Sequence, residues 1–299
     1  MNRNISLSIV LLLAAVAAQA QVVSFINLPD NAARMALGGT DVSYDVSRLQ
    51  ERGYYGSAEA TYFVWEPSMH AGGSVGRYMA DGYARLGENL GISARGRISN
   101  VRSLSYMDDS GKPGVGFKSA EFMAGVGMHY RPFNNISVLA RVDLISSNLA
   151  ANFAAKAVAA DLGVAYDFND LSVALTVRNL GSKLKYAQTA SEALPTVVLL
   201  GGEYIFGAGR HIIDISADAG FMPQQKCALA KLGVRLSLFG VADIMAGYHY
   251  GSNSQLEPSY ATAGLGAEIS FLRLSAAYVI AGKSSPMKNT MAFTLGARF

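Results

Sequence analysis

The last stretch of the sequence, MAFTLGARF at Met291–Phe299, has a large or apolar residue at every second position. Odd-numbered residues share one face of an extended strand and even-numbered residues share the other, because successive side chains leave a pleated backbone on opposite sides. The pattern predicts a β-strand with one apolar face. A soluble protein can also contain such a half-buried strand, so the rest of the chain decides the fold.

The same alternation recurs along the chain, and we count about fourteen candidate strands, with the first hundred residues the least regular. Short turn signals separate some of these strands and longer polar stretches separate others. The two kinds of connection tend to alternate in the C-terminal half, as the short turns and long loops of outer-membrane barrels do. Clear examples of the alternation are residues 136–145, 171–178, 212–219, 232–238, 263–270 and 272–280.

A soluble β-sandwich alternates too, but it shows a charged face to water. Here the polar face is rich in Gly, Ser, Thr and Ala, which suits a crowded or partly wet barrel interior. The apolar face ends in aromatic residues, as the interfacial girdles of membrane barrels do. We therefore predict an all-β fold, a transmembrane antiparallel β-barrel of about 14 strands, with Phe299 as the signal read by the barrel-insertion machinery. The girdle residues are Tyr130, Tyr166, Phe168, Tyr204, Phe206, Phe239, Tyr248, Tyr250 and Phe299.

Residues 1–20 have the three parts of a secretory signal peptide. Arg3 supplies a positive charge, Ile9–Ala18 is an apolar core, and Ala18–Ala20 (AQA) has the form of a cleavage site. The alternative is an N-terminal membrane anchor, but the core is short for a span of about 20 residues. We expect cleavage before Gln21 and export of a barrel comprising residues 21–299 to the outer membrane.

The composition argues against several classes of function. The net charge of +3 is not gathered into a basic tract, so we expect no nucleic-acid partner. The single Cys227 cannot form an internal disulfide, and no two histidines have a metal-ligand spacing, so we expect no metal or cofactor. His249 and Asp243 share a strand face but lie too far apart to bond, and no serine has a nucleophile-elbow motif. We therefore predict that the protein is not an enzyme.

Strand phase places a set of charged residues on the side that faces the lumen. Unpaired buried charge is costly, so these groups need water, partners or both. Two arrangements satisfy this requirement, namely a salt-bridged network that holds an inner plug and the lining of an aqueous pore, and we favour the network. The predicted lumen-facing charges are Arg141, Asp143, Arg178, Asp214, Asp218, Lys231, Arg235, Asp243, Glu268, Arg273 and Arg298.

A short helix is predicted within residues 28–39 (LPDNAARMALGG), inside a possible plug segment at 21–45. Pro29 and Asp30 suit the start of such a helix, and Gly38 suits its end. The segment is either a structural stopper or a gate on a path for a hydrophobic ligand. The candidate outer loops, chosen by length and polarity, are residues 107–116, 181–195 and 250–259.

Several phrases, taken in order, resemble the PorV/PorQ family of outer-membrane proteins. They include Met35–Gly39 (MALGG), Arg178–Gly181 (RNLG), Leu194–Pro195 and Asn289–Thr290. The resemblance covers most of residues 22–299 and is strongest from about residue 120 onward. The residues that carry it are Met35, Gly38, Gly39, Asn179, Leu180, Gly181, Pro195, Asn289 and Thr290.

The resemblance implies a barrel similar to the long-chain fatty-acid transporters and a role in the type IX secretion system. PorV-like members shuttle cargo with C-terminal signal domains from the translocon to a surface attachment complex, and PorQ-like members scaffold that complex. The C-terminal half here is more PorV-like. One departure is that the Asn-Pro-Ala segment of the family is missing, and Val46–Gly56 (VSRLQERGYYG) stands in its region.

We therefore expect a lipid-embedded barrel that binds secretion components and secreted cargo. The alternative is an outer-membrane transporter for small hydrophobic or amphipathic molecules.

Overall fold

The structure, a computed structural model, describes residues 24–50, 54–65, 75–100, 120–150, 153–186, 190–254, 256–283, 285 and 287–299. The predicted signal peptide at residues 1–20 and the predicted loop at residues 107–116 lie outside these residues. No helix in the described part of the chain is long and apolar enough to cross a membrane.

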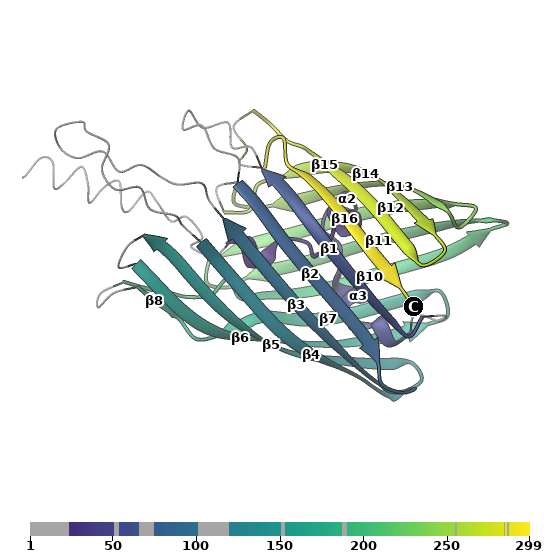
Figure 1. The fold of residues 1–299 in the computed structure, drawn as a ribbon, viewed down its shortest axis with the longest axis horizontal. Coiled ribbons are helices and arrows are strands. Elements are labelled where there is room, and N and C mark those ends of the chain that lie inside the picture. Colours follow the sequence, from purple (N-terminus) through teal and green to yellow (C-terminus); the bar gives the residue numbers. More distant parts are fainter. Residues whose placement is uncertain are drawn as a thin grey trace, which may run out of the picture.

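Fourteen antiparallel strands close into a barrel, as predicted (Figure 1). Sequence neighbours pair throughout, except that β7 pairs with β10 and that β1 closes the barrel against β16. The short strands β8 (Leu184–Tyr186) and β9 (Ala190–Glu192) form a separate hairpin within the predicted loop at residues 181–195. The barrel strands are β1 Gly56–Trp65, β2 Val75–Arg85, β3 Leu90–Asn100, β4 Ala120–Phe133, β5 Ile136–Ala150, β6 Phe153–Phe168, β7 Leu171–Gly181, β10 Val197–Ala208, β11 His211–Met222, β12 Cys227–Leu238, β13 Ala242–Gly251, β14 Tyr260–Ile269, β15 Leu272–Ile280 and β16 Met291–Arg298.

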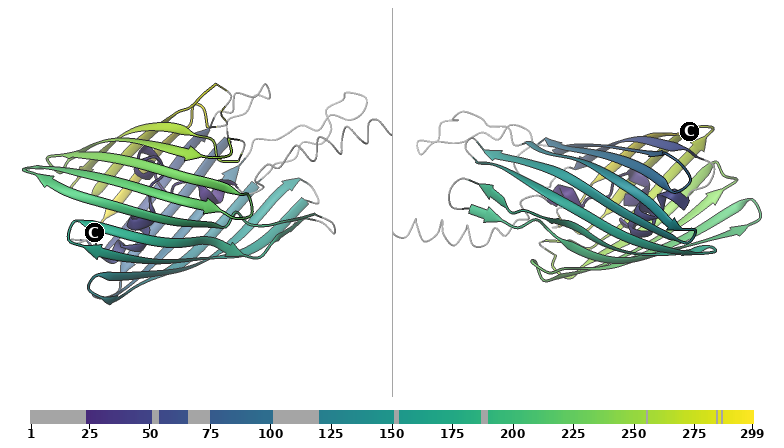
Figure 2. Two further views of the ribbon diagram at one scale, coloured as in Figure 1. Left: turned by 180° about the vertical axis from the view of Figure 1, so that it is seen from behind. Right: turned by 90° about the horizontal axis from the view of Figure 1, so that it is seen from below.

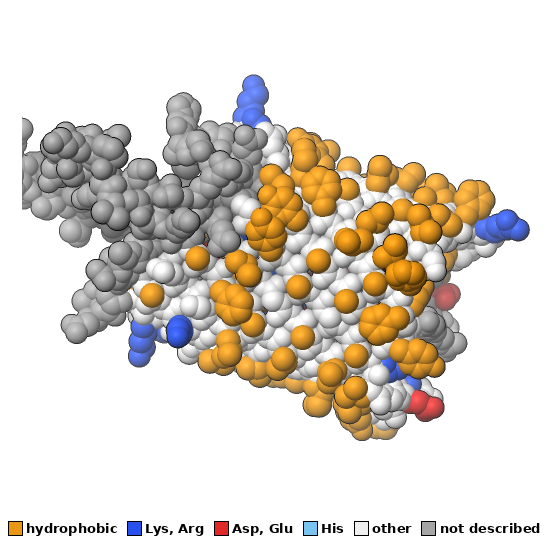
Figure 3. All heavy atoms as spheres, viewed as in Figure 1, with side chains coloured by type: hydrophobic (Ala, Val, Ile, Leu, Met, Phe, Trp, Pro, Cys, Tyr) orange, Lys and Arg blue, Asp and Glu red, His pale blue; other side chains and the backbone are white. Residues whose placement is uncertain are grey.

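The period-two pattern places apolar side chains on the outer wall and mixed side chains inside. On β5, Arg141 is 2% exposed, whereas its outward neighbours Val142 and Leu144 are 50% and 60% exposed. On β16, Phe293 and Leu295 point outward, and the residues between them are buried. Figure 3 shows the result, an outer wall covered by hydrophobic side chains, with basic groups toward its ends. Such a wall suits lipid.

The two ends of the barrel differ. Short turns join β2 to β3, β4 to β5, β6 to β7, β10 to β11, β12 to β13 and β14 to β15 at one end, which we call the turn end. Asn169, Gly209 and Gly240 adopt the left-handed backbone that these tight turns need. The other ends of these strands lie at the opposite end of the barrel, which we call the loop end. Outer-membrane barrels have their short turns on the periplasmic side.

Residues 24–50, which we call the inner segment, lie inside the barrel (Figures 1 and 2). The segment contains η1 (Ser24–Asn27), α2 (Ala32–Ala36), α3 (Val42–Val46) and η2 (Arg48–Gln50). Helix α2 packs on β13 to β16, and α3 packs on β5, β6, β7 and β10. The segment begins at the loop end and continues toward the turn end, where the Tyr54 hydroxyl donates to Glu268 at 2.8 Å.

The predicted helix exists, but the prediction of its first residues is wrong. Helix α2 is capped by Asn31, whose side-chain oxygen accepts from the Arg34 backbone N–H at 2.8 Å. Asp30 does not cap the helix because its carboxylate pairs with Arg97 on β3. Gly38 follows the helix with φ of +70°, as the predicted end requires.

Candidate functional site

The barrel wall holds the inner segment by buried ion pairs. Arg141 on β5 donates two hydrogen bonds to the Asp45 carboxylate on α3, with N–O distances of 2.8 and 3.0 Å. Arg178 on β7 donates to Asp41 at 2.9 Å and lies 3.6 Å from Asp45. Charge-assisted pairs of this kind are stronger than neutral hydrogen bonds and fix the geometry of both partners.

Inward charges that the sequence reasoning missed extend this contact over the whole segment. Arg48 donates to Asp81 on β2 at 2.7 Å, at the turn end. Arg34 on α2 lies 3.5 Å from Glu203 on β10. Arg97 pairs with Asp30 at the other end of the segment. Alternation in LGISARGRISN, residues 90–100, was the signal that would have placed Arg97 in the lumen.

Two of the predicted lumen charges contact the backbone of the inner segment. Lys231 donates to the carbonyl of Gly39 at 2.9 Å, and Asp218 accepts from the backbone N–H of Asp41 at 3.0 Å. These contacts satisfy polar groups between α2 and α3 that would otherwise be buried without partners.

Other predicted charges pair within the wall. Arg95 donates to Asp143 at 2.7 and 2.8 Å and to Asp161 at 2.7 Å. Arg235 lies 2.8 Å from Asp214. The interior of the barrel therefore carries a dense network of ion pairs between mixed charges.

Charges at the turn end form a looser group. Glu268 lies 4.0 Å from Arg273 and 3.8 Å from Arg298, and it also accepts from Tyr54. Asp243 forms no ion pair with the residues that the structure describes. Glu268 keeps 24% of its side chain exposed, so this group is partly open to water.

Gly38 and Gly39 lie where the inner segment presses on the wall. A Cβ on Gly38 would stand 2.6 Å from the Tyr248 carbonyl oxygen and 2.8 Å from the Leu232 carbonyl oxygen. A Cβ on Gly247 of β13 would stand 2.1 Å from the Gly38 nitrogen. Only glycine permits this approach of two backbones. Met35, one turn earlier, is fully buried.

A bulge in β7 anchors the start of the inner segment. Between the pairs Ala160–Leu180 and Leu162–Val177, β7 has one residue more than β6. Within this bulge, Asn179 has φ of +57°. Its backbone N–H donates to Asp161 at 2.8 Å, and its side-chain amide donates to Asn27 at 2.8 Å and to the Pro195 carbonyl at 3.1 Å. The bulge thus turns Arg178 and Asn179 inward together.

The other motif residues have structural positions too. Leu180 points outward, and a Cβ on Gly181 would stand 2.1 Å from the Val158 carbonyl oxygen. Asn289 has φ of +57° in the turn before β16, and the Thr290 carbonyl accepts from Val279 at 2.9 Å. The motif residues therefore serve the turns, the bulge and the inner contacts of the barrel.

The loop-end mouth of the lumen is lined by apolar side chains that pack together. Phe25 and Ile26 of η1 pack against inward side chains of β4, β5, β6 and the β8–β9 hairpin. Arg97 fixes them by donating to the Phe25 and Ile26 carbonyls at 3.1 and 2.6 Å. The wall side chains of this mouth are Met123, Ile145, Ala155, Ala157, Ala159, Leu184, Tyr186 and Leu194.

A small cavity remains beneath this mouth. Its volume is about 40 Å³, and both apolar groups, such as Leu199 and Leu229, and charged groups, such as Arg178 and Lys231, line it. An apolar cavity that holds benzene measures about 150 Å³. This cavity is therefore too small to hold a hydrocarbon of the size of benzene.

The histidines among the described residues do not form a hydrolytic triad or a metal site. His129 Nε2 lies 3.0 Å from the Ser93 hydroxyl, but both are buried, and no carboxylate bonds the other ring nitrogen among the described contacts. His249 stacks on Tyr260 and lies 3.4 Å from Glu257. Within the described ranges, no group of three acidic, His or Cys residues could hold a metal ion. A hydrolytic triad needs an oriented base and an accessible nucleophile.

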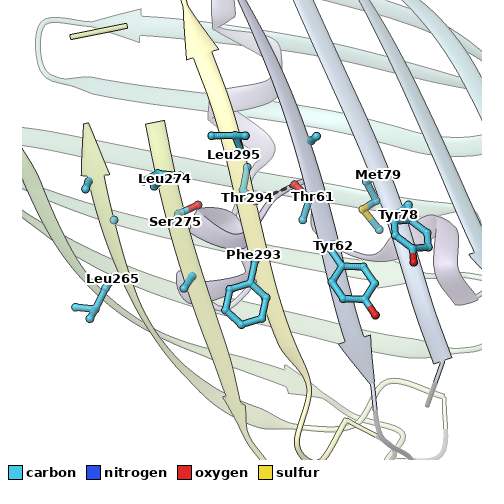
Figure 4. Close-up of a pocket in the computed structure, with 14 residues that line it drawn as sticks. Thr61, Tyr62, Tyr78, Met79, Leu265, Leu274, Ser275, Phe293, Thr294 and Leu295 are labelled. Atoms are coloured by element: carbon cyan, nitrogen blue, oxygen red, sulfur yellow. Dashed lines mark hydrogen bonds between the residues drawn. The ribbon is translucent and has the colours of Figure 1, made fainter. Parts of the chain in front are cut away.

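Two apolar hollows lie on the outer wall among the residues that the structure describes. One, of about 660 Å³, lies across the seam of the barrel, where β1 meets β16 (Figure 4). The stacked Tyr62 and Tyr78 stand on one side of it and Leu265 on the other. Beneath them, the Thr61 and Thr294 hydroxyls bond across the seam at 2.8 Å. The second hollow, of about 690 Å³, extends over β1 to β6.

Comparison with known proteins establishes the fold. The sequence matches no protein-family model and no curated protein sequence. In structure, the chain is similar to the toluene transporter TbuX of Ralstonia pickettii, with a TM-score of 0.67 and 11% identity over 92% of this chain and 100% of TbuX. It is also similar to the toluene transporter TodX of Pseudomonas putida, with a TM-score of 0.63 and 12% identity over 91% of this chain and 97% of TodX.

A third similar structure is the monoaromatic hydrocarbon channel CymD, with a TM-score of 0.61 and 11% identity over 91% of this chain and 98% of CymD. The chain therefore has the fold of fourteen-stranded outer-membrane transport barrels. This agrees with the predicted barrel similar to the long-chain fatty-acid transporters. None of these three structures is a PorV/PorQ protein, so they lend no support to that finer resemblance.

Proposed function

We propose that this protein is an outer-membrane transporter for small hydrophobic molecules and that its inner segment is the gate. The observation that carries the proposal is the apolar mouth at the loop end, where wall and inner segment bury hydrophobic side chains together. Apolar clefts with a few polar groups are typical of sites for hydrophobic ligands. The toluene and monoaromatic transport named for the similar barrels supports the same substrate class.

Movement of the inner segment is part of this proposal. The cavity below the mouth is smaller than a single aromatic ring requires, and α2 and α3 pack against the barrel wall. The start of the segment is held chiefly by apolar packing and by hydrogen bonds to Arg97 and Asn179. A hydrophobic ligand would replace the apolar packing of Phe25 and Ile26, so we place the first opening step at η1.

The experiment is an uptake assay in cells that express the protein and lack other hydrocarbon transporters. Labelled toluene is the probe, and labelled glycerol is the polar control. The proposal predicts faster toluene uptake than in cells without the protein, with no change for glycerol. Equal acceleration of both solutes would indicate a general pore, and no acceleration of toluene in cells with a correctly inserted barrel would refute the proposal.

A role in type IX secretion is the second candidate function. The small volume of the cavity below the mouth favours it, because a shuttle or scaffold binds other proteins and needs no path for a ligand. Its partners would be cargo with C-terminal signal domains and other secretion proteins, bound at loops such as residues 181–195 and 250–259. Crosslinking in native membranes followed by mass spectrometry tests it, since recovery of those partners together with unchanged toluene uptake would favour secretion over transport.

A further inference from the structure

The hollow over β1 to β6 lies on the outer side of the wall. No residue of the inner segment lines it, and its larger lining side chains, such as Val126, Met128 and Leu162, are 51–68% exposed. Ala140 and Ala160 lie between these larger groups on β5 and β6, which leaves the space of about 690 Å³. The hollow is apolar and elongated across several strands, so it suits a hydrocarbon chain.

A group of three lysines, which we call the basic rim, lies toward the loop end of the same wall. Lys156 is exposed on β6, four residues or about 13 Å along the strand from Ala160. The Ser182 backbone donates to the Val158 carbonyl at 3.0 Å, so the chain after β7 continues beside β6. Leu184 is buried in the barrel mouth.

Residues that alternate with Leu184 and Tyr186 therefore lie on the outward side of the β8 hairpin. These residues are Lys183 and Lys185, and both are exposed. With Lys156, they place three cations on one outward face of two adjacent strands. None of the three forms an ion pair with any residue that the structure describes.

The surroundings of the basic rim add hydrogen-bonding groups, and the exposed acid of the hairpin, Glu192, is paired with Leu184 and so lies on the other face of the hairpin. Ser146 on β5 is paired with Lys156, and Asn148 follows it toward the loop end. Closer to the turn end, the outward residues of these strands are apolar, including Leu144 and Val158. The outer wall therefore changes from apolar to basic toward the loop end, the pattern expected of a barrel at the border between bilayer hydrocarbon and headgroups.

We propose that the hollow and the basic rim together bind one lipid, with an acyl chain in the hollow and a phosphate-bearing headgroup on Lys156, Lys183 and Lys185. Ammonium groups bind phosphate as point charges, and clusters of them recognise anionic headgroups. The bound lipid covers the outer wall of β5 and β6 and leaves the lumen untouched. The site is independent of the transport function.

Native mass spectrometry of the detergent-solubilised full-length barrel tests this site. The probes are phosphatidylglycerol and phosphatidylcholine with the same acyl chains. We expect one phosphatidylglycerol to bind in preference to phosphatidylcholine. The variant Lys156→Gln/Lys183→Gln/Lys185→Gln should lose at least about tenfold in affinity, since each lysine near an anionic headgroup contributes roughly fivefold. Raised salt should weaken binding to the wild-type barrel.

The matched charge control is Lys226→Gln/Lys283→Gln/Lys288→Gln, which removes three loop-end lysines from other connections. Ala160→Phe fills the hollow without changing charge, and Ala276→Phe does the same in the seam hollow of Figure 4. Binding should fall with Ala160→Phe and persist with Ala276→Phe. If Ala160→Phe fails to give a barrel by circular dichroism, Ala140→Phe on β5 replaces it.

Three results would overturn the proposal. One is equal binding by the basic-rim variant and its charge control. Another is that the basic-rim variant loses binding while a folded hollow-filling variant binds fully. Attraction between the lysines and the headgroup would then explain lipid binding without the hollow. The third is displacement of phosphatidylglycerol by excess inorganic phosphate, which would mark a site for a free anion.

Discussion

Arg141 on the wall and Asp45 on the inner segment form a two-fold hydrogen-bonded ion pair whose side chains are 1% and 3% exposed. The two residues are 96 positions apart in the sequence. Their pairing fixes α3 against β5 in the middle of the lumen. If the inner segment is the proposed gate, opening requires that it moves as a unit or loses this contact.

Removing one partner of this pair should destabilise the inner segment strongly. Arg141→Met leaves the Asp45 carboxylate buried, with Arg178 at 3.6 Å as a partial substitute, so we expect a loss of about 3 kcal/mol. Thermal unfolding in detergent measures this loss. The double variant Arg141→Met/Asp45→Leu removes both charges and should recover most of the stability. If the double variant were no more stable than Arg141→Met, the buried unpaired charge of Asp45 would not be the cause of the loss.

Gly38→Ala should displace the inner segment from the wall. The added Cβ would meet the backbone of Tyr248 and Leu232, which cannot rotate away, in addition to the strain of φ at +70°. Gly240→Ala is the matched control, because Gly240 has the same φ and open space around it. We expect about 1–2 kcal/mol of destabilisation for the control and at least about 2 kcal/mol more for Gly38→Ala. Equal melting temperatures for the two variants would refute the close approach.

Asn179→Gly should loosen η1 while leaving the barrel intact. Glycine keeps the left-handed backbone of the bulge but removes the side-chain bonds to Asn27 and Pro195, each worth about 1 kcal/mol. Hydrogen exchange in residues 24–31 should then be roughly tenfold faster, with the strands unchanged. Asn179→Ala adds backbone strain and should slow assembly as well. Unchanged exchange in Asn179→Gly would mean that the bulge does not hold the inner segment.

The sequence alone predicts the barrel because alternation is a local property of each strand. Residues 136–145 reveal both their outward apolar face and their inward charges without any knowledge of neighbours. The same rule, applied to residues 90–100, would have added Arg95 and Arg97 to the predicted lumen charges. The predicted start of α2 failed because a distant partner, Arg97, engages Asp30.

Partners inside the lumen lie beyond such local reasoning. Nothing near Asp45 in the sequence indicates that it faces Arg141, because the pairing depends on the path of the inner segment through the barrel. The bulge is a second case, since Arg178 and Asn179 both point inward and break the period of two. The secretion role implied by family resemblance stays a prediction, because the motif residues are explained by structural contacts.

A disulfide lock tests the central claim, that the inner segment must move for transport. The hydroxyl oxygens of Thr40 and Ser216 lie 2.7 Å apart, between the segment and β11, so Thr40→Cys/Ser216→Cys can form a crosslink. The native Cys227 is changed to Ser to prevent other pairings. We predict that oxidation abolishes toluene uptake and that reduction restores it. Equal uptake by the oxidised and reduced forms would contradict a moving gate.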